Sequence, residues 1–246
     1  MTNKFNISAF TLHILAMFLM LLDHLWATLL PAQEWMTCLG RIAFPIFAFM
    51  TVEGYFHTHN LKKYLLRLFI CALISEIPFD LMSNGLLFYP YHQNVIWTFI
   101  IGLIGIYLME LAKKKDRTTY YLSCLLVVIF GFLLGMLTMV DYYGPGVLTI
   151  FIFYFFRARK WWCYLGQFVG LWFINIELLG GLFYPVELLG YELEIVQQGF
   201  ALLALIPIWL YKGRQGYHSK TFKYICYGFY PAHMFIIWLI LSFVTK

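Results

Sequence analysis

Long apolar stretches separated by short polar segments dominate this sequence and constrain its fold more than any other feature. Apolar runs of about 17–25 residues can cross a bilayer as helices. β-Barrel strands do not fit, because they are shorter and alternate apolar with polar residues, whereas these runs are continuous. We predict nine spans, at 9–30, 39–57, 63–83, 94–112, 119–140, 144–157, 161–182, 195–211 and 224–244.

The low charge content agrees with this interpretation. Only 12% of the 246 residues are charged and 62% are hydrophobic, whereas about a quarter of the residues of a soluble domain are charged. We therefore predict an all-α, polytopic integral membrane helix bundle that forms a single domain over residues 1–246. The first span is longer than the apolar core of a signal peptide, about 7–15 residues, so we expect an uncleaved anchor. The five cysteines lack CxxC spacing and fit buried hydrophobic positions.

The basic residues predict the orientation, because Lys and Arg are retained on the cytoplasmic side of a membrane. Of the 17 Lys and Arg residues, all except Arg41 and Lys246 lie at the N-terminus or near the alternate connections that follow it. The opposite connections carry acidic residues such as Glu34 and Asp141. We expect the N-terminus in the cytoplasm and the C-terminus outside. The net charge of +5 then follows from topology and requires no nucleic-acid surface.

Several ionisable residues interrupt the predicted spans, although each costs about 2.5–3.5 kcal/mol to insert into a membrane. At a rise of about 1.5 Å per residue, polar residues from five segments fall in one depth band on the extracytoplasmic side. These residues are Asp23, His24, Arg41, Glu76, Asp80, Asn94 and Asp141. Their convergence predicts an intramembrane polar site that is open toward the outside.

The spacing of the acidic residues adds local geometry. Glu76 and Asp80 share one helical face at i, i+4, with Pro78 between them. Their carboxylates repel each other, so they need a cation, a shared proton or water, and Arg41 is the obvious cationic partner. Asp23 and His24 point about 100° apart on a helix. We expect one of these two to line a cavity and the other to pair with a neighbouring helix.

Structural and chemical roles both remain open for part of this set. Arg41 with Asp23 or Glu76 fits a buried ion pair that holds helices in register. For His24 a proton-transfer role is favoured, because a neutral imidazole accepts and returns a proton near ambient pH. His233 and Glu53 lie in the inner halves of their spans and fit a structural or a substrate-binding role equally well.

Seven sequence blocks are spread along the whole chain: LMLLDHLW (19–26), GRIAFPIFAFMTVEGYFHTHNLKKYLLRL (40–68), SEIPFDL (75–81), NVIWTFIIGL (94–103), DYYGPGVL (141–148), LYKGRQG (210–216) and YGFYPAHM (227–234). In this order they resemble the TraX family, membrane acetylases that modify F-type conjugative pilin. The outline is also similar to the wider transmembrane acyltransferase group, in which a His late in the first span precedes a Gly-aromatic segment and a basic loop. That group's Arg before the His would fall around Ile14, and this span contains no Arg.

The resemblance implies transfer of an acetyl group from cytoplasmic acetyl-CoA, or another acyl-CoA, across a bacterial inner membrane. The acceptor would be an amine or hydroxyl of a pilin-like peptide, a sugar or a lipid. We expect His24 to act as general base, assisted by Asp23, Arg41, Glu76 and Asp80. A ternary complex and a ping-pong route through an acyl-histidine both remain open, and no metal is expected.

Two further groups of residues complete the expected site. Residues expected to bind the acceptor are Asn94, Gln93, His92, Asp141, Glu53 and His233. Residues expected to bind the phosphates of CoA are Lys62, Lys63, Arg67 and Arg214, although positive-inside topology explains the same charges.

Two other functions would use the same polar residues. A transporter or flippase would use them as a proton relay or substrate site, but the sequence shows no inverted repeat. A non-catalytic scaffold would use Asp23, His24 and Arg41 only to hold helices together.

Overall fold

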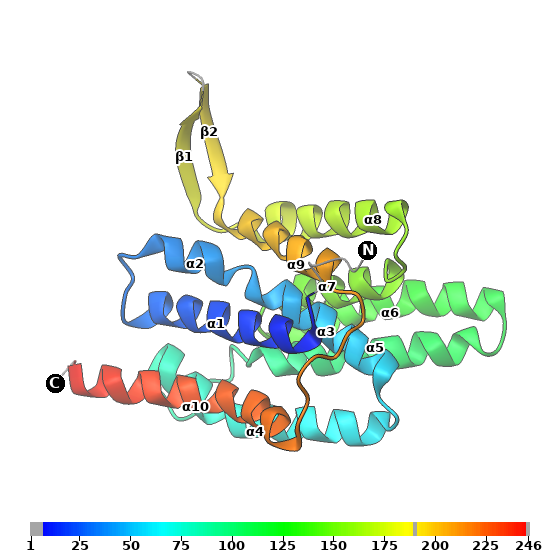
Figure 1. The fold of residues 1–246 in the computed structure, drawn as a ribbon, viewed down its shortest axis with the longest axis horizontal. Coiled ribbons are helices and arrows are strands. Elements are labelled where there is room, and N and C mark those ends of the chain that lie inside the picture. Colours follow the sequence, from blue (N-terminus) through cyan, green and yellow to red (C-terminus); the bar gives the residue numbers. More distant parts are fainter. Residues whose placement is uncertain (1–6, 189–190, 245–246) are drawn as a thin grey trace. The chain divides into compact units, whose positions relative to one another are not determined.

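The computed structural model describes residues 7–188 and 191–244 and is mainly helical (Figure 1). The described chain forms two compact units. One contains the residues up to Phe47 and those from Arg159 onward, and the other contains Ala48–Ala158. The division falls within helix α3 (Ala43–His57). Lys4 and Lys246, which entered the orientation count, lie outside the described residues.

In the first unit, α1 lies between two other helices (Figure 1). Ser8 begins α1 by accepting a hydrogen bond from the backbone N–H of Thr11 at 3.2 Å, which satisfies a donor that has no partner within the helix. α1 packs against α2 and α10, and α2 packs against η2, which also contacts η1, α8 and α9. The elements of this unit are α1 (Ala9–Thr28), α2 (Glu34–Gly40), α8 (Trp161–Trp172), the π-helix η1 (Phe173–Leu179), the 3-10 helix η2 (Gln197–Ala204), α9 (Leu205–Leu210) and α10 (Lys220–Val244).

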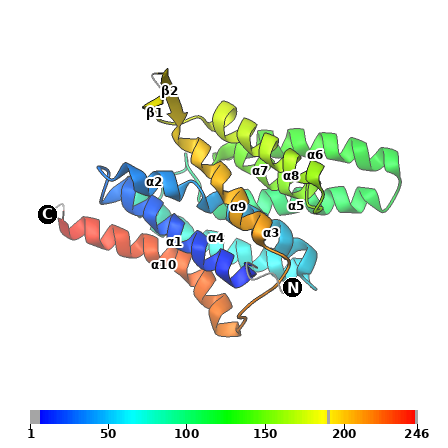
Figure 2. The ribbon, with the colours of Figure 1, turned by 45° about the horizontal axis from the view of Figure 1, so that its top comes forward.

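The second unit contains the rest of α3 and four further helices. α5, α6 and α7 pack against one another, and α4 packs against α5 (Figure 2). The ring of Phe151 on α7 sits where a Cβ at Gly105 or Gly131 would be, so these glycines allow the three helices to approach closely. The helices are α4 (Leu61–Asn84), α5 (Val95–Lys113), α6 (Arg117–Leu137) and α7 (Tyr143–Phe155).

Six helical segments of the described chain are long and apolar enough to cross a membrane. They are Ala9–Thr28, Glu34–His57, Val95–Lys113, Arg117–Leu137, Trp161–Leu179 and Lys220–Val244. The sequence predicted a span at each of these places. The remaining three predicted spans are also helical. α7 and Gln197–Leu210 are shorter than the six segments above. α4 contains five charged residues and is not among the six. Membrane crossing by these three segments stays a prediction.

The surface of α6 shows why the chain belongs in lipid. Only Gly131 and Gly135 are buried along this helix, and large apolar side chains such as Leu125, Phe130 and Leu137 are exposed. Water does not favour an apolar surface of this extent, whereas lipid tails do.

One element was not predicted. Residues between two expected spans form an antiparallel hairpin of β1 (Phe183–Leu188) and β2 (Tyr191–Val196), with Phe183 opposite Val196. The hairpin extends away from the helices of its own unit (Figure 1).

Candidate functional site

An ion pair joins α1 to the residue that follows α2. Nη2 of Arg41 lies 2.5 and 2.6 Å from Oδ1 and Oδ2 of Asp23, and the hydroxyl of Thr37 donates to Oδ1 at 2.8 Å. A Cβ on Gly40 would overlap the Asp23 side chain. Glycine at this position therefore allows α2 to approach the carboxylate. The structure thus contains the ion pair that the sequence suggested for Asp23 and Arg41.

Uncharged amides surround this ion pair, and the sequence analysis missed them. Nη1 of Arg41 donates to Oε1 of Gln198 at 3.5 Å, and Gln198 donates to Asn175 at 3.4 Å. Gln197 donates to the hydroxyl of Thr37 at 3.2 Å. Gln197, Gln198 and Asn175 are all buried. The signal that would have revealed them is an amide inside an apolar stretch, since each buried amide requires hydrogen-bond partners.

His24 points to a different helix. Its Nδ1 lies 2.7 Å from Nε2 of His233 on α10. The ring planes differ by 8°, and the ring centroids are 4.9 Å apart. The nitrogens are much closer than the centroids, so the rings meet through their nitrogen edges and not through their faces. His233 is 5% exposed, and its Nδ1 lies 2.7 Å from the carbonyl oxygen of Phe229.

The expected divergence of Asp23 and His24 is therefore present. Asp23 faces α2, His24 faces α10, and these helices contact α1. Their different directions agree with the angular separation of adjacent residues on a helix.

In the second unit, Glu76 joins α4 to the start of α5. Its Oε2 accepts hydrogen bonds from the side-chain amide of Asn94 and, at 2.8 Å, from the indole N–H of Trp97. Its Oε1 accepts the backbone N–H of Asn94 at 3.3 Å. Asn94 is fully buried and also begins α5 by accepting the N–H of Ile96 at 3.1 Å. Amide and indole donors therefore stabilise Glu76. Trp97 was not among the predicted site residues.

Asp80 and its neighbours form the rest of this group. Asp80 is 1% exposed, and its Oδ2 accepts the backbone N–H of Tyr89 at 2.8 Å. Its Oδ1 is buried and has no hydrogen-bond partner within the described residues. His92 Nε2 lies 3.3 Å from Oδ1 of Asp141. Gln93 pairs through its backbone with the segment that precedes α7, donating to the carbonyl of Met139 at 2.9 Å and accepting from Asp141 N at 2.9 Å.

The pKa of His92 is raised above its ordinary value of 6.5. The main cause is the hydrogen bond to Asp141, which favours the imidazolium form. Burial lowers the pKa, and the negative charges of Asp141, Glu76 and Asp80 raise it further. A loop histidine beside several acids is thereby held in its charged form to higher pH than a free histidine.

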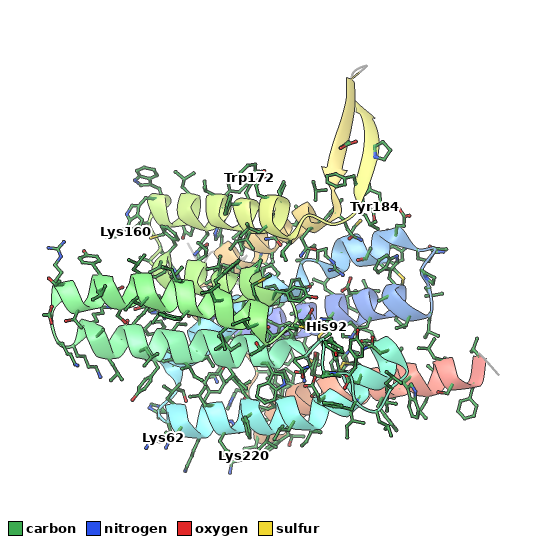
Figure 3. The ribbon with its side chains drawn as sticks, turned by 180° about the vertical axis from the view of Figure 1, so that it is seen from behind. Lys62, His92, Lys160, Trp172, Tyr184 and Lys220 are labelled. Carbon is green, nitrogen blue, oxygen red and sulfur yellow. The ribbon has the colours of Figure 1, made fainter. Side chains whose placement is uncertain are left out.

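The remaining predicted site residues are those expected toward the cytoplasmic side. Glu53, which we predicted to bind the acceptor, accepts a hydrogen bond from Nε of Arg157 at 2.6 Å. Its carboxylate is therefore part of an ion pair. Lys62 and Lys63 are exposed in the first turn of α4. Figure 3 shows Lys62 at one end of α4 and His92 beyond the other end. Arg67 lies near the ring of Tyr64, and Arg214 is exposed between α9 and α10.

The structure thus brings several of the predicted site residues together as pairs within each unit. The first unit brings together Asp23 with Arg41 and His24 with His233, and the second brings together Glu76 with Asn94 and His92 with Asp141. The idea that all of them share one site stays a prediction. Within residues 7–188 and 191–244, no group of three or more His, Cys, Asp or Glu side chains is arranged to hold a metal ion.

Lipid-compatible helices with paired polar side chains between them define a helical membrane protein. The family described as "TraX protein" matches residues 8–241, so this chain belongs to the TraX family, as its sequence blocks predicted. The chain is 28% identical over 253 residues to a protein named "Probable fimbrial assembly protein FimC, serogroup H1" from Dichelobacter nodosus. That similarity covers 96% of this chain and 97% of the relative. No solved structure matches the chain.

The Asp23–Arg41 pair predicts a strong energetic coupling. Asp23→Ala or Arg41→Ala leaves the opposite charge in a largely buried place, which costs about 3–5 kcal/mol for a buried pair. We expect each single variant to lower the thermal midpoint in detergent, measured by fluorescence-detected size-exclusion chromatography. The thermal midpoint of the double variant should fall by much less than the sum of the decreases in the two single variants. Strictly additive losses would contradict a direct interaction.

The His92–Asp141 contact predicts a pH-dependent stability. The pKa of His92 is raised in the folded state, so its stabilising effect is complete below pH 6.5 and disappears as pH rises through the folded pKa. Asp141→Asn should therefore lower the thermal midpoint most below pH 6.5, and the gap to the parent should narrow at higher pH. In a His92→Gln background, Asp141→Asn should have no such pH dependence. A gap that is constant with pH in both backgrounds would refute this coupling.

Proposed function

We propose that this protein is a membrane acyltransferase that moves an acetyl group from cytoplasmic acyl-CoA to an acceptor on the extracytoplasmic side. The observation that carries the proposal is the 2.7 Å contact between His24 and His233. Two imidazoles at hydrogen-bond distance can accept, hold and return a proton, which acyl transfer from a thioester requires. Membership of the TraX family further supports the proposal, because the resemblance to that family implies acetyl transfer to pilin.

In this reaction an amine or hydroxyl of the acceptor attacks the thioester carbonyl of acyl-CoA. A C–N or C–O bond forms, and the proton of the acceptor passes to His24. The C–S bond then breaks, and the thiolate of CoA recovers that proton from the His24 imidazolium. The products are the acylated acceptor and CoA with a free thiol, so no other reactant is needed.

The developing oxyanion requires a hydrogen-bond donor or a positive charge. Arg41 is favoured over Asn94 for this role, because its guanidinium carries a positive charge, whereas the Asn94 amide is neutral and donates to Glu76 and to the carbonyl of Ala72. Asp23 and Gln198 hold the Arg41 guanidinium from two sides. An arginine oriented in this way stabilises charge without having to reorganise during the reaction.

The proposed topology has nine spans with the N-terminus in the cytoplasm. α4 supports a crossing despite its charges, because its 24 residues extend about 36 Å, and the hydrocarbon core is about 30 Å thick. Lys62 and Lys63 would then meet the phosphates of CoA inside, where Arg67 and Arg214 would add positive charge. Glu76 and Asp80 would lie toward the outside and support acceptor binding together with His92, Gln93 and Asp141.

The acceptor that we propose is a subunit of a surface filament. The relative from Dichelobacter nodosus is named as a fimbrial assembly protein, and the similarity spans nearly all of both chains. The buried Oδ1 of Asp80 offers a hydrogen-bond acceptor to an N–H or O–H of such a substrate. Sugars and lipids are the competing acceptors.

The proposed base predicts a product that mass spectrometry can detect. Surface proteins, glycans and lipids from cells that express the parent should carry the mass increment of one acetyl group. His24→Ala should lose it, because loss of a general base slows transfer about 10²–10⁴-fold. His13→Ala, a change in the same helix outside the polar groups, should retain the increment. Undiminished acetylation by a folded His24→Ala variant would refute the base, and CoA-independent flux of solute would favour a transporter.

The proposed orientation predicts opposite labelling at the two ends of α5. In a background without native cysteines, Leu87→Cys should react with an impermeant maleimide added to intact cells. Lys115→Cys should react only after permeabilisation. Both positions are exposed, so accessibility within the protein is matched. The reverse pattern would overturn the orientation.

A further inference from the structure

We infer that His233 is a positioning residue that fixes the tautomer of His24 and thereby selects Nε2 of His24 as the base nitrogen. This inference deepens the proposed function and rests on it. Its starting point is the contact between Nδ1 of His233 and the carbonyl oxygen of Phe229, at 2.7 Å. A carbonyl oxygen only accepts hydrogen bonds, so Nδ1 of His233 must carry a proton.

The protonation of the second nitrogen follows from the first. With a proton on Nδ1, a neutral His233 presents the lone pair of Nε2 to its partner. Nδ1 of His24 lies 2.7 Å from this lone pair, so it must donate. If it carried no proton, two lone pairs would face each other at hydrogen-bond distance. The proton of neutral His24 is therefore on Nδ1, and Nε2 is the nitrogen that gains and loses a proton.

The surroundings of His233 hold its ring in this orientation. His233 is 5% exposed and lies parallel to the ring of Phe229, with centroids 4.7 Å apart and planes that differ by 13°. Phe229 thus contacts His233 through both its ring and its carbonyl oxygen. Residues 229 and 233 are one helical turn apart on α10, so this arrangement is local and does not require a second helix.

A neutral acceptor suits this location. In Ser-His-Asp enzymes a carboxylate fixes the tautomer of the catalytic histidine and stabilises its positive charge. A carboxylate in that role would bring a further charge into the apolar interior, at a high desolvation cost. His233 supplies the acceptor without a charge. When His24 takes the proton of the acceptor, its Nδ1–H bond to His233 becomes charge-assisted and stronger.

The test uses ¹⁵N NMR of histidine-labelled protein in lipid nanodiscs, together with acetylation kinetics. The signal of His24 is assigned by its loss in His24→Gln. In the parent we expect the proton of neutral His24 on Nδ1. His233→Leu removes the acceptor and should release His24 to the Nε2–H form, whereas His233→Gln retains an acceptor oxygen and should preserve the Nδ1–H form.

The acetylation rates should differ between the two variants in the same way as the tautomer of His24. His233→Leu should lower kcat by up to about 10⁴-fold, the loss that follows when a catalytic histidine is left in the wrong tautomer, and should leave the KM for acyl-CoA unchanged. His233→Gln should recover most of the rate. Equal rates for the parent and a folded His233→Leu variant would overturn the inference, as would equal losses in both variants.

The two proposals fail in distinguishable ways. A proton on Nε2 of His24 in the parent spectrum overturns the tautomer assignment, even if neither variant folds. If instead His24 has the Nδ1–H form and His24→Ala leaves acetylation unchanged, the proposed function is refuted while the tautomer assignment holds. An Nδ1–H signal in the parent that is lost in His233→Leu and retained in His233→Gln supports the inference.

Discussion

A charged group in an apolar interior is stable only with a partner, and the Asp23–Arg41 ion pair meets this requirement in the first unit. The pair connects α1 to the end of α2, and Gly40 makes the close approach possible. Thr37 and Gln198 add hydrogen bonds to the two charges. With Asp23 held toward α2, the next residue of α1 is directed to another helix.

That second direction brings two imidazoles together. Nδ1 of His24 lies 2.7 Å from Nε2 of His233 on α10. Adjacent positions of α1 thus pair in two different directions, Asp23 with Arg41 and His24 with His233. The contact between the two imidazoles is the basis on which we propose an enzyme and not a scaffold.

The second unit satisfies its buried acids with uncharged donors. Glu76 accepts from an amide and an indole, and Asp80 accepts from a backbone N–H. These bonds fix the start of α5 and the loop before it against α4. The other oxygen of Asp80 is buried and has no hydrogen-bond partner within the described residues.

The sequence by itself determined the helical membrane fold, its family and the polar residues worth examining. Hydropathy reveals spans because a membrane requires every backbone hydrogen bond to be made within a helix, and the 100° step separates Asp23 from His24 regardless of their neighbours. It did not reveal Gln197, Trp97 or the hairpin. Nor did it pair His24 with His233, because helical periodicity gives the direction of a side chain but not which distant helix lies there. Only the tertiary packing of α1 against α2 and α10 decided those partners.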